Sequence, residues 1–198
     1  MAKYNVYMVK TYFIPEGPWS VGTGFASYTA LMSNYGLRKE SDIRNAELLL
    51  LPGGADLGAN LERDEYDSEC LEYARAVGLK IFGICRGMQL MLSSTGCKLL
   101  THLPDIDNLL EHRTMTGNWK GQSCWHRTSS GLLVNTRHHQ GFLYAPEWDI
   151  IDKSSDGIIE AVWKGNEFGV QWHPEHPEMI NTLAYRWLEY ELIRREII

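Results

Sequence analysis

The order of apolar and polar positions predicts strands and helices that alternate along the chain. Residues 48–51 are four consecutive leucines, which is typical of a strand that is buried on both faces of a parallel sheet. Apolar side chains recur at helical spacing in residues 25–35 and again in residues 61–78. Residues 81–82 form a short apolar run before another apolar, helix-favouring stretch. This alternation predicts a doubly wound, mostly parallel α/β sheet.

The remaining segments add a first strand, a hairpin and a closing helix. Residues 5–9 are expected to form the first strand. Residues 158–163 and 168–172 are apolar runs on either side of a polar turn, a pattern that predicts a β-hairpin. A broad apolar stripe after Met179 predicts the last helix, and it comprises Ile180, Leu183, Ala184, Trp187, Leu188 and Leu192. No repeat or linker interrupts the chain, so residues 1–198 are interpreted as one domain.

The helix predicted over residues 61–78 separates apolar from acidic side chains. Its buried face is expected to carry Tyr66, Cys70, Ala74 and Val77. The charged residues fall mostly on its other faces, and we interpret them as a solvated surface rather than a metal site. They are Asp64, Asp67, Glu69, Glu72 and Arg75.

Composition excludes several classes of function. The chain has 198 residues, a net charge of −6 and no block rich in Lys or Arg, which argues against a nucleic-acid-binding surface. No stretch approaches the roughly 20 apolar residues of a membrane span, and no apolar signal core follows Met1, so we expect a soluble, cytoplasmic protein. The four cysteines lie far apart, which favours reduced thiols. Cys124 and His126 lack a zinc-ligand spacing, and we expect neither a metal nor a cofactor.

The stretch from Gly83 to Gly87, Gly-Ile-Cys-Arg-Gly, has the form of a nucleophile elbow, in which a strand turns abruptly into a helix. A side chain at either glycine would collide with the tight turn or with the helix that packs on the strand. Cys85 would then lie at a helix N-terminus, where the helix dipole favours the thiolate over the thiol. The alternative interpretation is a small buried cysteine in an ordinary strand-to-helix turn.

A thiol that attacks an amide also needs a base, a group that orients the base, and donors for the oxyanion. His173 follows a predicted strand and could accept and return the proton. Glu175, two residues further on, would point to the same side of an extended chain and could fix the imidazole tautomer. Backbone N–H groups of the glycines in Pro52-Gly53-Gly54, with that of Arg86, could hold the oxyanion at the carboxyl ends of parallel strands. Ordinary surface turns are the alternative for both segments.

These segments together resemble a known family. Three signature blocks of the class I glutamine amidotransferase-like superfamily are matched by Pro52-Gly53-Gly54, Gly83-Ile-Cys-Arg-Gly-Met-Gln89 and Gly169-Val-Gln-Trp-His-Pro-Glu175. Further segments resemble the γ-glutamyl-γ-aminobutyrate hydrolase branch of this superfamily, which is the C26 type of cysteine peptidase. These segments are Leu51-Pro-Gly-Gly-Ala-Asp56, Arg63-Asp64, Val134-Asn-Thr-Arg-His-His-Gln-Gly141 and Ser155-Asp-Gly-Ile-Ile-Glu-Ala161. The resemblance runs in order from Leu48 to Glu175, is weakest over residues 103–131, and implies a flavodoxin-like fold.

Carried over residue by residue, the resemblance implies a role for seven positions. Cys85 would be the nucleophile, His173 the general base and acid, and Glu175 the residue that orients His173. Gly54 and Arg86 would supply oxyanion N–H groups. Gln89 and His138 would line the γ-glutamyl pocket, although a helix-surface residue and a loop histidine are the alternative interpretations. The chain differs from the hydrolase pattern in its short N-terminal part and shorter loops, which decide what amine the substrate carries.

The resulting hypothesis is a cysteine-dependent hydrolase or glutaminase that cleaves a small γ-glutamyl amide through a γ-glutamyl thioester. A second possibility is the glutaminase subunit of an amidotransferase, which would deliver ammonia to a synthetase or ligase partner in trans. A third, of another class, is a non-catalytic relative that binds a metabolite or a protein. Residues 103–131 are polar and rich in turn residues, and we interpret them as a flap over the site.

Overall fold

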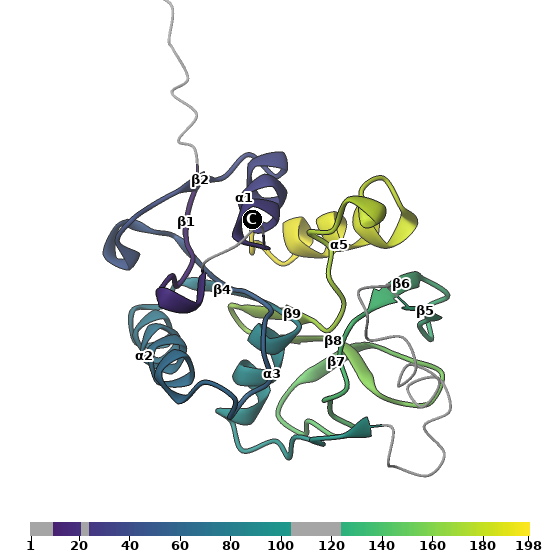
Figure 1. The fold of residues 1–198 in the computed structure, drawn as a ribbon. Coiled ribbons are helices and arrows are strands. Elements are labelled where there is room, and N and C mark those ends of the chain that lie inside the picture. The colour runs from purple at the N-terminus through teal and green to yellow at the C-terminus, as the bar shows by residue number, and fades with distance from the viewer. Residues whose placement is uncertain (1–9, 21–23, 104–123) are drawn as a thin grey trace, which may run out of the picture.

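A mostly parallel sheet runs through the centre of the computed structural model, which describes residues 10–20, 24–103 and 124–198 (Figure 1). Its strands are β1 (Thr11–Phe13), β2 (Arg38–Lys39), β3 (Leu48–Leu51), β4 (Lys80–Ile84), β7 (Asp149–Lys153), β8 (Ile159–Lys164) and β9 (Glu167–Val170). Within the described residues the order across the sheet is β2-β1-β3-β4-β9-β8-β7. The first five pair in parallel, whereas β8 is antiparallel to both of its neighbours. This arrangement confirms the predicted doubly wound sheet.

Helices cover both faces of this sheet, and the leucines of β3 show why. The helices are α1 (Gly24–Asn34), α2 (Leu61–Val77), α3 (Arg86–Ser93) and α5 (Leu183–Arg194). In the ribbon, α1 and α5 lie on one face of the sheet and α2 and α3 on the other (Figure 1). Leu48 and Leu50 belong to the apolar cluster that includes residues of α1 and α5, and Leu49 and Leu51 belong to the cluster that includes residues of α2 and α3. All four side chains are at most 1% exposed. A continuous apolar run is therefore what a strand between two helical layers requires.

Helix α2 has the predicted length but not the predicted buried face. Asn60 caps its first turn by accepting from the Arg63 N–H at 3.1 Å, and Gly78 ends it in the left-handed conformation with φ 76°. The prediction of a solvated acidic face is wrong for Asp67, which is 0% exposed, and the prediction of a buried Val77 is wrong because Val77 is 54% exposed. The buried face consists of Arg63, Asp67, Cys70, Leu71 and Ala74.

The C-terminal part confirms the predicted hairpin and corrects the predicted helix. Strands β8 and β9 pair antiparallel with Trp163 opposite Phe168. A 3-10 helix, Pro177–Met179, precedes α5, whose cap Thr182 accepts from the Tyr185 N–H at 3.1 Å. The prediction of a buried apolar stripe is wrong at its start, where Leu183 is 77% and Ile180 is 43% exposed. Further along the helix, Leu188 and Leu192 are fully buried.

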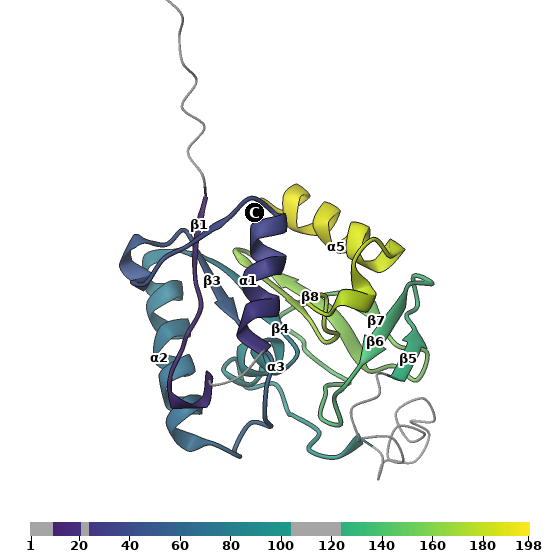
Figure 2. The ribbon, with the colours of Figure 1, turned by 45° about the horizontal axis from the view of Figure 1, so that its top comes forward.

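A second, two-stranded sheet lies beside the β7 end of the main sheet (Figure 2). It consists of β5 (Cys124–Arg127) and β6 (Leu133–Thr136), and a bridge between Thr128 and Ser154 connects it to the segment after β7. The predicted first strand at residues 5–9 and most of the predicted flap at 103–131 lie outside the described residues. Of the helices that the structure describes, none has the length and apolar character to cross a membrane.

Candidate active site

A cleft of about 420 Å³ opens at the carboxyl ends of the central parallel strands. Gly53 and Gly54 after β3, Cys85 after β4, and His173 and Glu175 after β9 all line it. A cleft at this edge is the usual place for a ligand in an open α/β sheet. The structure therefore brings together five of the residues that the sequence predicted.

Cys85 occupies a strained turn between β4 and α3. Its backbone has φ 51° and ψ −107°, a conformation that residues with a side chain rarely adopt. A Cβ on Gly87 would overlap the carbonyl oxygen of Leu51, and a Cβ on Gly83 would lie 2.8 Å from the backbone nitrogen of Met88. Both glycines therefore allow strand, turn and helix to pack closely, as the elbow pattern predicts. The thiol lies at the N-terminal end of α3 and is 5% exposed.

His173 is held in place by two neighbours. Its Nδ1 lies 2.8 Å from Oε1 of Glu175, so the carboxylate accepts the imidazole N–H. Asn135 on β6 clamps the backbone: its Oδ1 accepts from the His173 N–H at 2.9 Å, and its Nδ2 donates to the His173 carbonyl at 3.1 Å. With Nδ1 occupied by Glu175, the other ring nitrogen is the one that can exchange a proton with a neighbouring group.

The charges around His173 favour its protonated form. Burial lowers the pKa of His173, but Glu175 and Cys85 outweigh burial by charge attraction and hydrogen bonding, so the pKa lies well above 6.5. Burial acts to raise the pKa of Glu175, and the nearby His173 reverses this and lowers it below 4.5. The arrangement is thus a buried ion pair next to a thiol. In this pair the histidine is protonated, and a protonated histidine can act as a general acid.

The substitution Glu175→Gln should reveal this ion pair in the pH dependence of stability. A histidine whose pKa is raised in the folded state contributes its full stabilisation below its ordinary pKa of 6.5. That stabilisation is lost as the pH rises through the pKa of the folded state. A glutamate whose pKa is lowered in the folded state contributes its full stabilisation above its ordinary pKa of 4.5. That stabilisation is lost as the pH falls through the pKa of the folded state. The Tm difference between wild type and variant should therefore peak between about pH 4.5 and 6.5. A difference that stays constant into the alkaline range would contradict the assignment.

The glycine loop after β3 is fastened by Tyr28 of α1. The Gly53 N–H donates to Oη of Tyr28 at 2.9 Å. Burial, together with the charges of Glu175 and Cys85, raises the pKa of Tyr28 well above 10. A Cβ on Gly53 would lie 2.8 Å from Oη of Tyr28 and 2.9 Å from Cε1 of His173. Only glycine therefore fits between the tyrosine and the histidine.

A buried ion-pair network lies behind the same loop. Arg63 donates from Nη2 to the Gly53 carbonyl at 2.8 Å and from Nε to Oδ2 of Asp67 at 3.3 Å. Asp67 also accepts from Arg86, whose other terminal nitrogen donates to Asp64. Arg63, Asp67 and Arg86 are at most 5% exposed. These contacts explain why Asp67 is buried rather than solvated.

Gln89 lies below the cleft and reaches the thiol through another glutamine. Its Nε2 donates to the carbonyl of Gln140 at 3.1 Å and to Oε1 of Gln171 at 3.3 Å. Gln171 in turn places Nε2 3.5 Å from Sγ of Cys85. Gln89 is 3% exposed and is not among the described residues that line the cleft. Its role in the γ-glutamyl pocket therefore stays a prediction.

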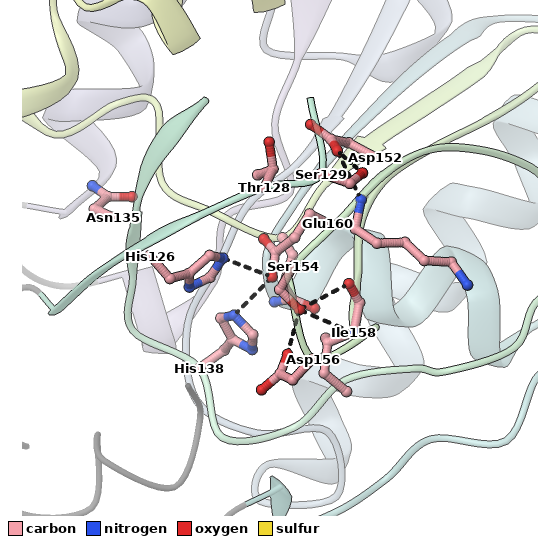
Figure 3. Close-up of polar contacts among 12 residues, drawn as sticks. His126, Thr128, Ser129, Asn135, His138, Asp152, Ser154, Asp156, Ile158 and Glu160 are labelled. Atoms are coloured by element: carbon pink, nitrogen blue, oxygen red, sulfur yellow. Dashed lines mark hydrogen bonds and ion pairs between the residues drawn. The ribbon is translucent and has the colours of Figure 1, made fainter. Parts of the chain in front are cut away.

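His138 also lies away from the cleft, in a buried group with Glu160 and His126 (Figure 3). Its Nε2 is 3.7 Å from Oε1 of Glu160, and Nε2 of His126 is 3.1 Å from the same oxygen. Nδ1 of His138 contacts the Gln140 carbonyl at 2.9 Å. The alternative of a simple loop histidine does not describe this side chain, which is 3% exposed, and its assignment to the substrate pocket stays untested.

Sequence reasoning missed Tyr28, Asn135 and Gln171 as parts of this site. Asn135 and Gln171 stand within the segments that carried the family resemblance, whereas Tyr28 had no local signal beyond helical spacing. For metal binding, His173, Glu175 and His176 present ligand atoms within 4.8 Å of one another. His173 and Glu175 already form a hydrogen bond with each other, so the group fits a proton-transfer site better than a metal site.

The chain is similar in sequence and fold to known proteins. The peptidase C26 family model matches residues 51–175. The chain is 32% identical over 142 residues to a γ-glutamyl-γ-aminobutyrate hydrolase of Escherichia coli O157:H7, covering 62% of this chain and 56% of that protein. It is 26% identical over 157 residues to one of the subunits of the glutamine-hydrolysing GMP synthase of Methanothrix thermoacetophila, covering 73% of this chain and 76% of that subunit.

Among solved structures, the fold is similar to that of PurLQS from Thermotoga maritima. The TM-score is 0.67 and the identity 19%, with 96% of this chain and 100% of that chain covered. The chain spans about half the length of the curated γ-glutamyl-γ-aminobutyrate hydrolases that it matches. The family model covers well over half of the chain and includes the elbow, the glycine loop and the His-Pro-Glu segment. The chain therefore belongs to the peptidase C26 family, within the class I glutamine amidotransferase-like superfamily.

Proposed function

We propose that this chain hydrolyses a γ-glutamyl amide, with Cys85 as nucleophile, His173 as general base and acid, and Glu175 as the residue that orients His173. The observation that carries the proposal is that one cleft holds both Cys85, which occupies a strained turn at the N-cap position of α3, and the hydrogen-bonded pair of His173 and Glu175. The similarity to γ-glutamyl-γ-aminobutyrate hydrolases supports the substrate class.

The reaction would proceed in two halves. The Cys85 thiolate attacks the γ-carbonyl carbon, and the N–H groups of Gly54 and Arg86 receive the developing oxyanion; the first N–H groups of a helix such as α3 have no acceptor within the helix. His173 then gives its proton to the leaving nitrogen as the C–N bond breaks, which leaves a γ-glutamyl thioester. In the second half, His173 takes a proton from water, the hydroxide attacks the thioester, and glutamate leaves while the thiolate is restored.

A substrate panel tests this proposal. Glutamine, several γ-glutamyl amines and a folyl-polyglutamate are incubated with the protein, and released glutamate is measured together with the intact mass after acid quenching. We expect glutamate release from at least one substrate, and a quenched adduct of one γ-glutamyl group on the peptide that contains Cys85. Absence of both glutamate and adduct with every substrate would refute the hydrolase and favour a non-catalytic binding protein.

A glutaminase that acts with a synthetase partner is the second candidate. The similarity to a component of a glutamine-hydrolysing GMP synthase and the fold similarity to PurLQS favour it. In this case glutamine hydrolysis would be slow for the chain alone and would rise when a co-purifying synthetase is added. Fast turnover of a γ-glutamyl amine by the isolated chain, with no protein captured, would decide for the free-standing hydrolase.

A further inference from the structure

Two side chains hold the backbone of Gly53, one at its N–H and one at its carbonyl. On one side the Gly53 N–H donates to Tyr28, and on the other the Gly53 carbonyl accepts from Nη2 of Arg63 at 2.8 Å. Arg63 belongs to α2, a different element from those that carry the cysteine and the histidine. Arg63 lines the cleft, but only 5% of the residue is exposed.

The planarity of the peptide between Gly53 and Gly54 links the carbonyl of Gly53 to the N–H of Gly54. In a trans peptide these two groups point in opposite directions, so fixing one fixes the other. While the Gly53 oxygen accepts from Arg63, the Gly54 N–H must point away from that guanidinium. Rotation of the peptide would break this hydrogen bond and turn the N–H around. Gly54 has φ 149°, and a Cβ there would overlap the Arg63 guanidinium, so the arginine occupies the space next to the loop.

We propose that Arg63 is a positioning residue that keeps the Gly54 N–H turned toward the oxyanion. The inference rests on the proposed function, in which that N–H stabilises the tetrahedral intermediate. Arg63 does not touch the reacting atoms in this scheme. It acts through the Gly53 carbonyl, and its effect is expected in the transition state rather than in substrate binding.

Asp67 makes the position of Arg63 rigid and connects it to the second oxyanion donor. Its Oδ2 accepts from both Arg63 and Arg86, and it is 0% exposed. Arg86 directly follows Cys85, and its own backbone N–H is the other proposed donor. One buried carboxylate therefore holds the side chains that flank both donors. Two arginines and two acids, Asp64 and Asp67, balance the charge of this network.

The test compares Arg63→Ala and Arg63→Lys with Arg75→Ala as a matched control. Arg75 lies on the same helix and pairs with Glu167 at 2.8 Å outside the cleft. Loss of one oxyanion donor typically lowers kcat by about 100- to 1,000-fold, so Arg63→Ala should lower kcat by about 100-fold or more and change KM by less than about threefold. Arg63→Lys, which keeps a cationic donor, should recover part of kcat, and Arg75→Ala should retain wild-type kcat.

The kcat of Arg63→Ala in the presence of added guanidinium ion distinguishes a positioning role from a purely structural one, because a purely structural defect would not respond to the ion. At millimolar concentration, too low to denature, it should raise the kcat of Arg63→Ala by at least about tenfold by occupying the vacated site, and it should leave Arg75→Ala unchanged. A folded Arg63→Ala that keeps kcat within about threefold of wild type, or that shows no guanidinium rescue, would overturn the inference.

A crystal structure of Arg63→Ala separates this inference from the proposed function. We expect the Gly53 carbonyl to rotate away from its present direction or to lose a single orientation. An unchanged peptide in that crystal structure would overturn the positioning role whether or not the protein is active. Conversely, a wild type that releases no glutamate refutes the proposed function, while the orientation of the peptide is still decided by the crystal structure.

Discussion

The Cys85→Ala variant should release glutamate at least roughly 10,000-fold more slowly than the wild-type chain from its best substrate. Removing the nucleophile of a catalytic triad eliminates the covalent path, and the remaining binding and oxyanion contacts support only a small residual rate. The fold should persist, because alanine fits the space of a thiol and is the smaller side chain in a strained turn. The measurement is glutamate release under conditions of saturating substrate.

Cys97→Ala is the matched control for this experiment. Cys97 is a free, partly exposed thiol after the end of α3, and its removal should leave turnover at the wild-type level. Cys85→Ser adds a second comparison, since it retains a hydroxyl of similar shape but lower acidity. Undiminished turnover by Cys85→Ala would contradict the assignment of the nucleophile, even if glutamate release itself is confirmed.

The Asp67→Ala variant should lose about 3–5 kcal/mol of unfolding free energy, because removal of one partner of a buried ion pair leaves uncompensated charge in the interior. Its carboxylate is fully buried and accepts from both Arg63 and Arg86, each at most 5% exposed. The loss of the carboxylate therefore costs more than the ion pairs themselves contribute. Urea denaturation followed by circular dichroism should show the loss as a lower midpoint with an unchanged slope.

Glu147→Ala serves as the surface comparison. Glu147 pairs with Lys164 at 2.8 Å, but the two side chains are 62% and 40% exposed. Surface pairs of this kind contribute little because water already solvates both charges. Its urea midpoint should stay close to that of the wild type. Equal midpoints for Asp67→Ala and wild type would show that the buried network is not important for stability.

The sequence predicts those parts of the site whose chemistry lies within a few residues. The elbow is readable because Gly83 and Gly87 flank Cys85 at fixed distance, and the His173–Glu175 pair is readable because alternation along the chain puts both side chains on one side. The hairpin follows from two apolar runs and a short polar turn. In each case one local rule is enough to place the side chains.

Contacts between distant segments could not be predicted in this way. Tyr28 bonds a glycine 25 residues away, and Asn135 bonds a histidine 38 residues away. The sequence pattern places Asp67 on the surface because acidic residues on a helix are usually solvated, whereas its partner Arg86 lies 19 residues further along the chain. Helical spacing does place Asp67 on the same face as Cys70 and Ala74. Only the tertiary structure shows that two arginines neutralise it there.

The backbone conformation of Cys85 has a consequence for the evolution of this chain. A residue other than glycine at φ 51° costs of order 1–3 kcal/mol, and glycine at this position would relieve most of that cost. Selection for stability alone would therefore remove the cysteine. A lineage that kept the fold but had no use for the thiol would be free to replace it, so under the proposed function the retention of Cys85 would reflect reactivity that outweighs stability.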